Sequence, residues 1–149
     1  MAKSDFDYIV EDEPATNHVR QLVAGLVYFN DGRAEAENRS PLGVFARRGA
    51  EILGGVDGYT HWRWLCVSHL WVRDDLRGVG VGRHLMTTIE RHAWGRGCSG
   101  SWLDTFSFQA PDFYEAIGYR RFGELPDFPP GSHRYFLWKR LDEPVPSVS

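Results

Sequence analysis

The residues of this chain best suited to chemistry are three glycines at alternate positions behind an arginine. The stretch LRGVGVGRHLM, residues 76–86, places Gly78, Gly80 and Gly82 between a strand-like segment and an amphipathic run. Amides at a helix N-terminus lack intrahelical partners and carry partial positive charge, and glycines let them approach a phosphate closely. The pattern predicts an anion-binding turn. The alternative is that the glycines only permit a tight turn from strand to helix.

The spacing of the glycines limits which known phosphate-binding motif the turn can belong to. Three arginines near the turn, Arg73, Arg77 and Arg83, are expected to add cationic donors. The dinucleotide fingerprint requires G-x-G-x-x-G with an acidic residue on the next strand, and the spacing here is G-x-G-x-G. The P-loop requires a Lys-Ser or Lys-Thr pair after its last glycine, and none follows. Neither nucleotide-binding motif fits.

The elements that must position this turn follow from hydrophobic periodicity. Apolar residues recur at helical spacing over residues 16–30, with Thr16 or Asn17 as N-cap, and again after the glycines as far as Gly95 or Gly97. A short helix is expected at residues 110–118. Strands are expected at residues 6–10, 41–48, 51–59, 62–72, 99–108, 119–125 and 133–141. The segment 62–72 is almost continuously apolar, which indicates a central strand covered on both faces.

This order, β-α-β-β-β-α-β-α-β-β, predicts an α/β (α+β) domain with a mixed, largely antiparallel sheet of about seven strands flanked by helices. A chain of 149 residues suits one domain, expected over residues 1–141 with a flexible tail at 142–149. A net charge of −3 gives no tendency toward nucleic acid, and no apolar run is long enough to span a membrane. Cys66 and Cys98 have no metal-like spacing, so a reduced, cytoplasmic protein without a metal site is expected.

A third motif matches the glycine turn. Residues 77–82, Arg-Gly-Val-Gly-Val-Gly, satisfy [Q/R]-x-x-G-x-[G/A], and the later segment FYEAIGY resembles an FYxxxGF pattern. Both motifs, with the strand before the turn and the helix after it, resemble the GNAT (Gcn5-related N-acetyltransferase) family over about residues 62–122. The likeness is greatest to small bacterial single-domain members. It implies a GNAT-like fold that uses acetyl-CoA as cosubstrate and no metal.

The resemblance also implies roles for individual positions. Amides of the turn would hold the pyrophosphate, and the strand before it would pair with the pantetheine arm through its backbone. Ser107 stands where the family usually has an asparagine; its hydroxyl could still bond the pantetheine, but the departure from the family pattern weakens that assignment. The expected acetyl-CoA residues are Leu70, Trp71, Val72, Arg77, Gly78, Val79, Gly80, Val81, Gly82, Arg83, Ser107, Phe113 and Tyr114.

The implied chemistry is direct attack of an amine on the thioester, without a covalent enzyme intermediate. Tyr114 matches the tyrosine that protonates the departing thiolate, while both cysteines are expected to be structural. Deprotonation of the amine through water is the preferred interpretation. Ser68 and His69 are the candidate participants; strand parity with Leu70 favours Ser68, and the usual pKa of histidine favours His69. Further candidates for the base are His61, Asp104 and His133.

The sequence therefore predicts transfer of an acetyl group from acetyl-CoA to a primary amine of a small molecule. Acceptor-side loops are expected at residues 28–41 and 125–135. Two alternatives remain open: acetylation of a protein or peptide amine, and a non-catalytic acyl-CoA-binding module. Members of the family are often dimers, so the resemblance allows a homodimer.

Overall fold

The computed structural model describes residues 5–142, and the chain divides into two compact units between Ala36 and Glu37. The first unit contains one helix, α1 (Thr16–Asn30), which confirms the predicted bounds. Its N-cap is Ala15, whose amide donates to Glu11 Oε1 at 2.9 Å, so neither Thr16 nor Asn17 caps the helix. Residues 6–10 form no strand, which corrects that prediction; weak alternation is not enough without a paired neighbour.

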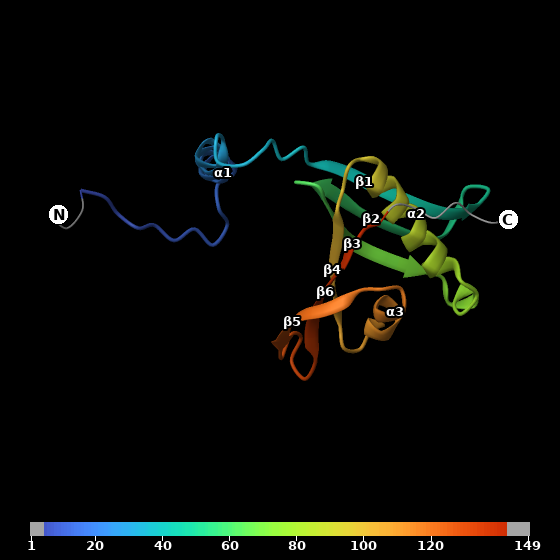
Figure 1. Cartoon of the computed structure of the whole chain (residues 1–149). Helices are drawn as coiled ribbons and strands as arrows, with labels where there is room; N and C mark the ends of the chain where they lie inside the picture. Colours follow the sequence, from blue (N-terminus) through green and yellow to red (C-terminus); the bar gives the residue numbers. More distant parts are fainter. Residues whose placement is uncertain (1–4, 143–149) are drawn as a thin grey trace. The chain divides into compact units, whose positions relative to one another are not determined.

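The second unit contains a single sheet with helices packed on it (Figure 1). Its six strands run in the order β1-β2-β3-β4-β6-β5, one strand fewer than predicted within the described residues. The elements in chain order are β1 (Ser40–Arg48), β2 (Glu51–His61), β3 (Trp64–Val72), the single-turn η1 (Asp74–Leu76), α2 (Val81–Gly95), β4 (Gly100–Phe106), α3 (Pro111–Ala116), β5 (Arg120–Pro126) and β6 (His133–Arg140).

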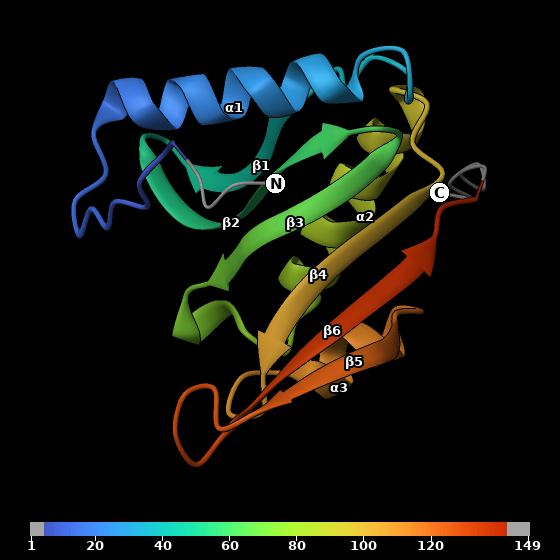
Figure 2. The same cartoon turned by 90° about the vertical axis from the view of Figure 1, so that its left-hand side faces the viewer.

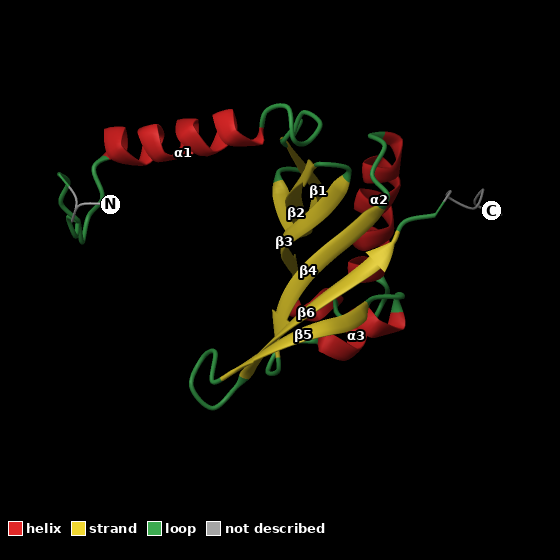
Figure 3. Cartoon of the chain, turned by 60° about the vertical axis from the view of Figure 1, so that its left-hand side comes forward, coloured by secondary structure: helices red, strands yellow, loops and turns green. Residues whose placement is uncertain are grey.

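Every strand pair is antiparallel except β3 with β4, which are parallel, as expected for strands joined through a helix. Helices α2 and α3 lie on the same face of the sheet (Figure 3). The core is packed between α2 and this face; its fully buried side chains include Val56, Leu65, Met86, Ile89, Leu103 and Leu137. The mixed, largely antiparallel fold class is thereby confirmed.

The parallel pair β3–β4 opens along its length. Pairing is limited to three positions, from Trp64 with Gly100 to Cys66 with Trp102. Beyond Cys66 the strands diverge, and Figure 2 shows them separating toward the carboxyl ends. The prediction that β3 is central is confirmed, but coverage of both faces is wrong for its second half. Ser68, His69 and Trp71 are exposed there, because both helices of the second unit, α2 and α3, lie on the opposite, core-facing side of the sheet.

Candidate active site

The glycine turn joins β3 to α2 through η1. Gly80 is the N-cap of α2 at φ +92° and Gly78 lies at φ +78°, conformations that side chains with a Cβ rarely adopt. The turn therefore does require glycine for its backbone. That requirement does not exclude ligand binding, because the same glycines border a large cavity.

The first turn of α2 offers unsatisfied amides. No side chain caps this helix, and its first turn contains no acidic residue. Uncapped amides at the positive end of a 15-residue helix form a site that favours an anion. Val81 and Gly82, which open the helix, both line the cavity. The geometry thus supports the predicted anion-binding turn.

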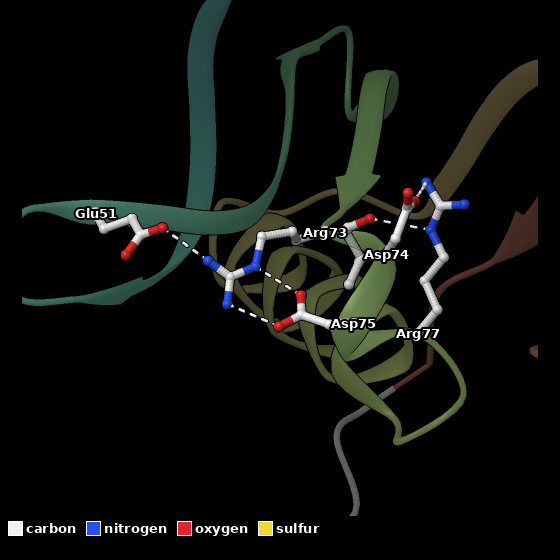
Figure 4. Close-up of polar contacts among 6 residues, drawn as sticks. Glu51, Arg73, Asp74, Asp75 and Arg77 are labelled. Atoms are coloured by element: carbon white, nitrogen blue, oxygen red, sulfur yellow. Dashed lines mark hydrogen bonds and ion pairs between the residues drawn. The ribbon is translucent and has the colours of Figure 1, made fainter.

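The three nearby arginines are not equivalent, and Figure 4 shows two of them, Arg73 and Arg77. Arg73 is held by Asp75, with Nε to Oδ1 at 2.6 Å, and by Glu51 at 2.7 Å, so it is not the mobile donor expected from the sequence. Arg77 donates from Nε to the Val72 carbonyl at 3.0 Å, and this hydrogen bond ties the turn to the end of β3. Within residues 5–142, the exposed side chain of Arg83 makes no hydrogen bond or ion pair, and Arg83 lines the cavity.

The cavity measures about 1100 Å³ and crosses the sheet where β3 and β4 diverge. Core-facing residues such as Leu103 and outward-facing residues such as Asp104 both contribute to its wall. Its lining is Val67, Ser68, His69, Leu70, Trp71, Val72, Leu76, Arg77, Gly78, Gly80, Val81, Gly82, Arg83, Leu103, Asp104, Thr105, Phe108, Gln109, Ala110, Phe113, Tyr114, Ala116 and Ile117. Most of the residues expected from the sequence are therefore brought together.

Two expected residues do not line this cavity. Val79 is 70% exposed on the outer side of the turn. The Ser107 hydroxyl accepts a hydrogen bond from the His133 amide at 3.0 Å, so it fixes the start of β6 instead of facing the cavity. The further candidates His61 and His133 also lie outside the lining, whereas Asp104 is part of it.

A β-bulge in the β2–β3 pair overturns the parity argument for Ser68. The register shifts at this point: Gly58 pairs with Val67, but Asp57 pairs with His69, so Ser68 is the additional residue. Along β3, the residue that faces the core after Val67 is therefore Leu70. The Ser68 side chain does not lie on this face. Gly58 is required here, since a Cβ at this position would lie 1.9 Å from the Cys66 carbonyl oxygen.

The bulge places His69 opposite Asp57. The His69 Nδ1 and Asp57 Oδ1 atoms are 2.8 Å apart, and the histidine side chain is 83% exposed where it borders the cavity. With the proton on Nδ1 donated to the carboxylate, Nε2 keeps its lone pair and can accept a proton. Asp57 was not predicted from the sequence, although an isolated glycine in a strand, Gly58, was a signal for the bulge.

Tyr114, on α3, borders the cavity from the helix side of the sheet. Burial, and to a lesser degree the negative charge of Asp104, raises the pKa of its phenol to about 12. The ring packs edge-on against Phe113, with centroids 5.1 Å apart. A phenol with this pKa keeps its proton throughout the neutral range and can donate it.

The far wall is formed by β4 and the loop after it. Asp104 Oδ2 accepts from Arg134 Nε at 2.7 Å, and both side chains are largely shielded from solvent. Gln109 and Phe108 line the wall beyond Asp104. These two loop residues were not predicted from the sequence, because no motif marks a residue that reaches the cavity only through the course of a loop.

The cysteines show the environment expected of structural residues. Both Cys66 and Cys98 are buried, and burial raises the pKa of each thiol, which disfavours a thiolate nucleophile. Over residues 5–142, no group of three or more His, Cys, Asp or Glu side chains could hold a metal ion. The helices of that same stretch include none long and apolar enough to cross a membrane.

Comparison with known proteins gives consistent matches. A profile of the acetyltransferase (GNAT) family matches residues 6–119. A blasticidin-S acetyltransferase from Streptomyces morookaense is 43% identical over 107 residues, which cover 68% of this chain and 78% of that protein. The acetyltransferase Atu2258 from Agrobacterium fabrum is 28% identical over 136 residues, covering 91% of this chain and 99% of that protein.

Solved structures share the fold. An acetyltransferase from Bacillus cereus superimposes with a TM-score of 0.81 at 29% identity, covering 90% of this chain and 98% of that one. A Bacillus anthracis protein classed as a streptothricin acetyltransferase, solved with acetyl coenzyme A, gives a TM-score of 0.61 at 19% identity over 68% of this chain and 63% of that one. The second likeness concerns the fold alone. Together with the family profile, the relatives show that this chain belongs to the GNAT family and is an acetyltransferase of that type.

Proposed function

We propose that this protein transfers an acetyl group from acetyl-CoA to a primary amine of a small molecule. The observation that carries the proposal is one continuous cavity, which begins at the uncapped N-terminus of α2 and passes between β3 and β4. The candidate anion site and the candidate proton-transfer groups thus border the same space. The neighbour of similar fold that was solved with acetyl coenzyme A supports the choice of cosubstrate.

Acetyl-CoA would be held largely by main-chain groups. The amides of Gly80, Val81 and Gly82 would receive the pyrophosphate, with Arg77 and Arg83 at its edge. Among the described residues, no strand pairs with the β4-facing edge of β3 beyond Cys66. The amide groups of the pantetheine arm would pair with this edge, at Leu70–Val72, as an added strand does.

The reaction would proceed by direct attack of the neutral amine on the thioester carbonyl. The oxyanion that forms would be stabilised by backbone N–H groups of β3 at the bulge near Ser68. When the tetrahedral intermediate collapses, the carbon–sulfur bond breaks and the thiolate leaves. Tyr114 would donate its phenolic proton to that thiolate, a role for which a pKa of about 12 keeps the proton in place.

The amine must lose a proton before it attacks or as it attacks. His69 would accept this proton at Nε2, directly or through a water molecule, while Asp57 holds Nδ1–H at 2.8 Å. The contact fixes the ring orientation and stabilises the imidazolium that forms. Asp57 acts here as a positioning residue, since it is not part of the cavity lining.

A small-molecule acceptor is supported by the relative from Streptomyces morookaense, which is named for blasticidin-S. The direct test is thiol release from acetyl-CoA in the presence of blasticidin-S, a panel of small primary amines, and peptides with free N-termini or lysines. Release with small amines supports the proposal. Release only with peptides would favour a peptide acetyltransferase, and saturable acetyl-CoA binding without release would favour a non-catalytic module.

A further inference from the structure

Three phenylalanines form a stack beside the mouth of the cavity. Phe106 ends β4, and its ring is nearly parallel to that of Phe108, with centroids 5.4 Å apart and an interplanar angle of 4°. On the β5–β6 loop, Phe128 is also stacked against Phe106, at 6.0 Å and 23°. Phe108 therefore ends the stack, and it is the member that lines the cavity. It is 63% exposed.

The loop that carries Phe108 is held in place at several points. Gln109 Oε1 accepts hydrogen bonds from the Phe106 amide and the Thr105 hydroxyl, both at 3.0 Å. The amide of Ser107 donates to the His133 carbonyl at 2.9 Å. A ring exposed on a fixed backbone loses little conformational entropy when it binds a ligand. An exposed aromatic ring beside a cavity is therefore organised for contact.

Charged groups lie next to the stack. The Arg134 guanidinium is 4.9 Å from the centroid of Phe128 and is paired with Asp104, which lines the cavity. The Asp104 carboxylate and the Phe108 ring thus line the same cavity, so that one acceptor can contact both. Most of the surrounding wall is apolar, which suits contact with a ring.

We propose that Phe108 is a stacking platform for the acceptor, and that the preferred acceptors carry a flat, conjugated ring. This inference rests on the proposed acetyl transfer and narrows its substrate class. A conjugated ring can continue the offset, near-parallel arrangement of Phe108 and Phe106, whereas a puckered saturated ring cannot. The platform lies on the β4 side of the cavity, across the gap from His69.

The test compares 2-phenylethylamine with 2-cyclohexylethylamine, which have the same primary amine on the same chain. The wild-type protein should show a kcat/KM about three- to tenfold higher for the phenyl compound, as expected for an aromatic pair. Phe108→Leu should bring the ratio close to one, and Phe108→Trp should keep or increase it. Phe122→Leu is the matched control, because Phe122 is 59% exposed on β5 and lies outside the cavity lining.

The outcomes separate the platform from the transfer activity. Equal use of the two amines, or a ratio unchanged in Phe108→Leu, would overturn the platform and leave acetyl transfer intact. Turnover of other amines but neither of these two would also overturn it, since a platform at the mouth should accept a bare phenyl ring. If none of the amines tested causes thiol release, the proposed function itself is contradicted. Melting temperatures of the two leucine variants report whether either substitution acts through stability instead.

Discussion

The two ends of the cavity are built from different parts of the polypeptide. At the α2 end, the groups that would face the ligand are main-chain amides within one turn, set by glycines at φ +78° and +92°. At the opposite end they are side chains from separate strands and loops, including His69, Asp104 and Phe108. The first end suits a ligand group that does not vary, such as a nucleoside diphosphate. The second can change with the acceptor while the fold stays the same.

This contrast explains why one end is visible in the sequence and the other is not. A backbone anion site needs a fixed local spacing of glycines, which a single stretch of sequence displays. The acceptor end depends on which residues meet across the gap between β3 and β4 and at the bulge opposite Gly58. The residues of the acceptor end, such as His69 and Phe108, lie far apart in the sequence. The following changes test whether the two ends are functionally separable.

Gly80→Asp should have the largest effect, confined to the cosubstrate end. The residue would be strained at φ +92° and would place a carboxylate against the phosphates. We expect KM for acetyl-CoA to rise about a hundredfold, which corresponds to roughly 3 kcal/mol. Gly97→Asp is the matched control, because Gly97 has φ +91° and open space around it but does not line the cavity. Equal loss in both variants would attribute the effect to strain.

Tyr114→Phe should lower kcat by about a hundredfold while leaving KM for acetyl-CoA within about threefold, because it removes only a proton donor. The readout is steady-state thiol release. Tyr119→Phe provides the contrast: that hydroxyl donates to Glu90 at 2.9 Å in the core and does not reach the cavity. It should reduce stability without a selective loss of kcat. Normal turnover by Tyr114→Phe would remove this residue from the mechanism.

His69→Gln should lower kcat/KM about tenfold, and Asp57→Asn by a smaller factor, because the carboxylate acts only through the histidine ring. Binding of acetyl-CoA should be unchanged in both, which places the effect at the acceptor end. His92→Gln, on the exposed side of α2, should behave as wild type. Full activity in His69→Gln would leave water as the immediate proton acceptor, which was the preferred interpretation of the sequence.

The smallest effect concerns stability at alkaline pH. The phenol of Tyr114 has a pKa raised from about 10 to about 12, so the fold favours its neutral form. Between these values the unfolded chain loses the proton and the folded chain does not, so stability should fall as pH rises from 10 toward 12. Urea unfolding at pH 9 and pH 11 should show a smaller decrease for Tyr114→Phe than for wild type. Tyr28→Phe, at an exposed position, should match wild type.

The core of the fold could be predicted because its periodic segments are long. The bounds of α1 and the end of α2 at Gly95 follow from apolar spacing, and Pro111 marks the start of α3. The segment at residues 6–10 was misjudged, since a strand exists only if another strand pairs with it. Trp62 and Arg63 were assigned to β3, but both have positive φ and form the turn before it.

In the site, the errors share one physical origin. The parity argument for Ser68 assumed an uninterrupted strand, and one additional residue at the bulge reverses it. Arg73 looks like a phosphate ligand until its ion pairs with Asp75 and Glu51 are known. The hydroxyl of Ser107 is likewise committed to His133. Which partner a polar side chain selects depends on tertiary neighbours, and no local spacing records that choice.

The proposed function depends above all on binding of acetyl-CoA at the α2 end of the cavity. The most direct measurement is isothermal titration calorimetry of the whole protein with acetyl-CoA, with NADH and ATP as competing anions. We expect saturable binding of one acetyl-CoA per chain and much weaker heats with NADH and ATP. Absence of acetyl-CoA binding, or equal binding of all three nucleotides, would contradict it and leave the three glycines as a tight turn.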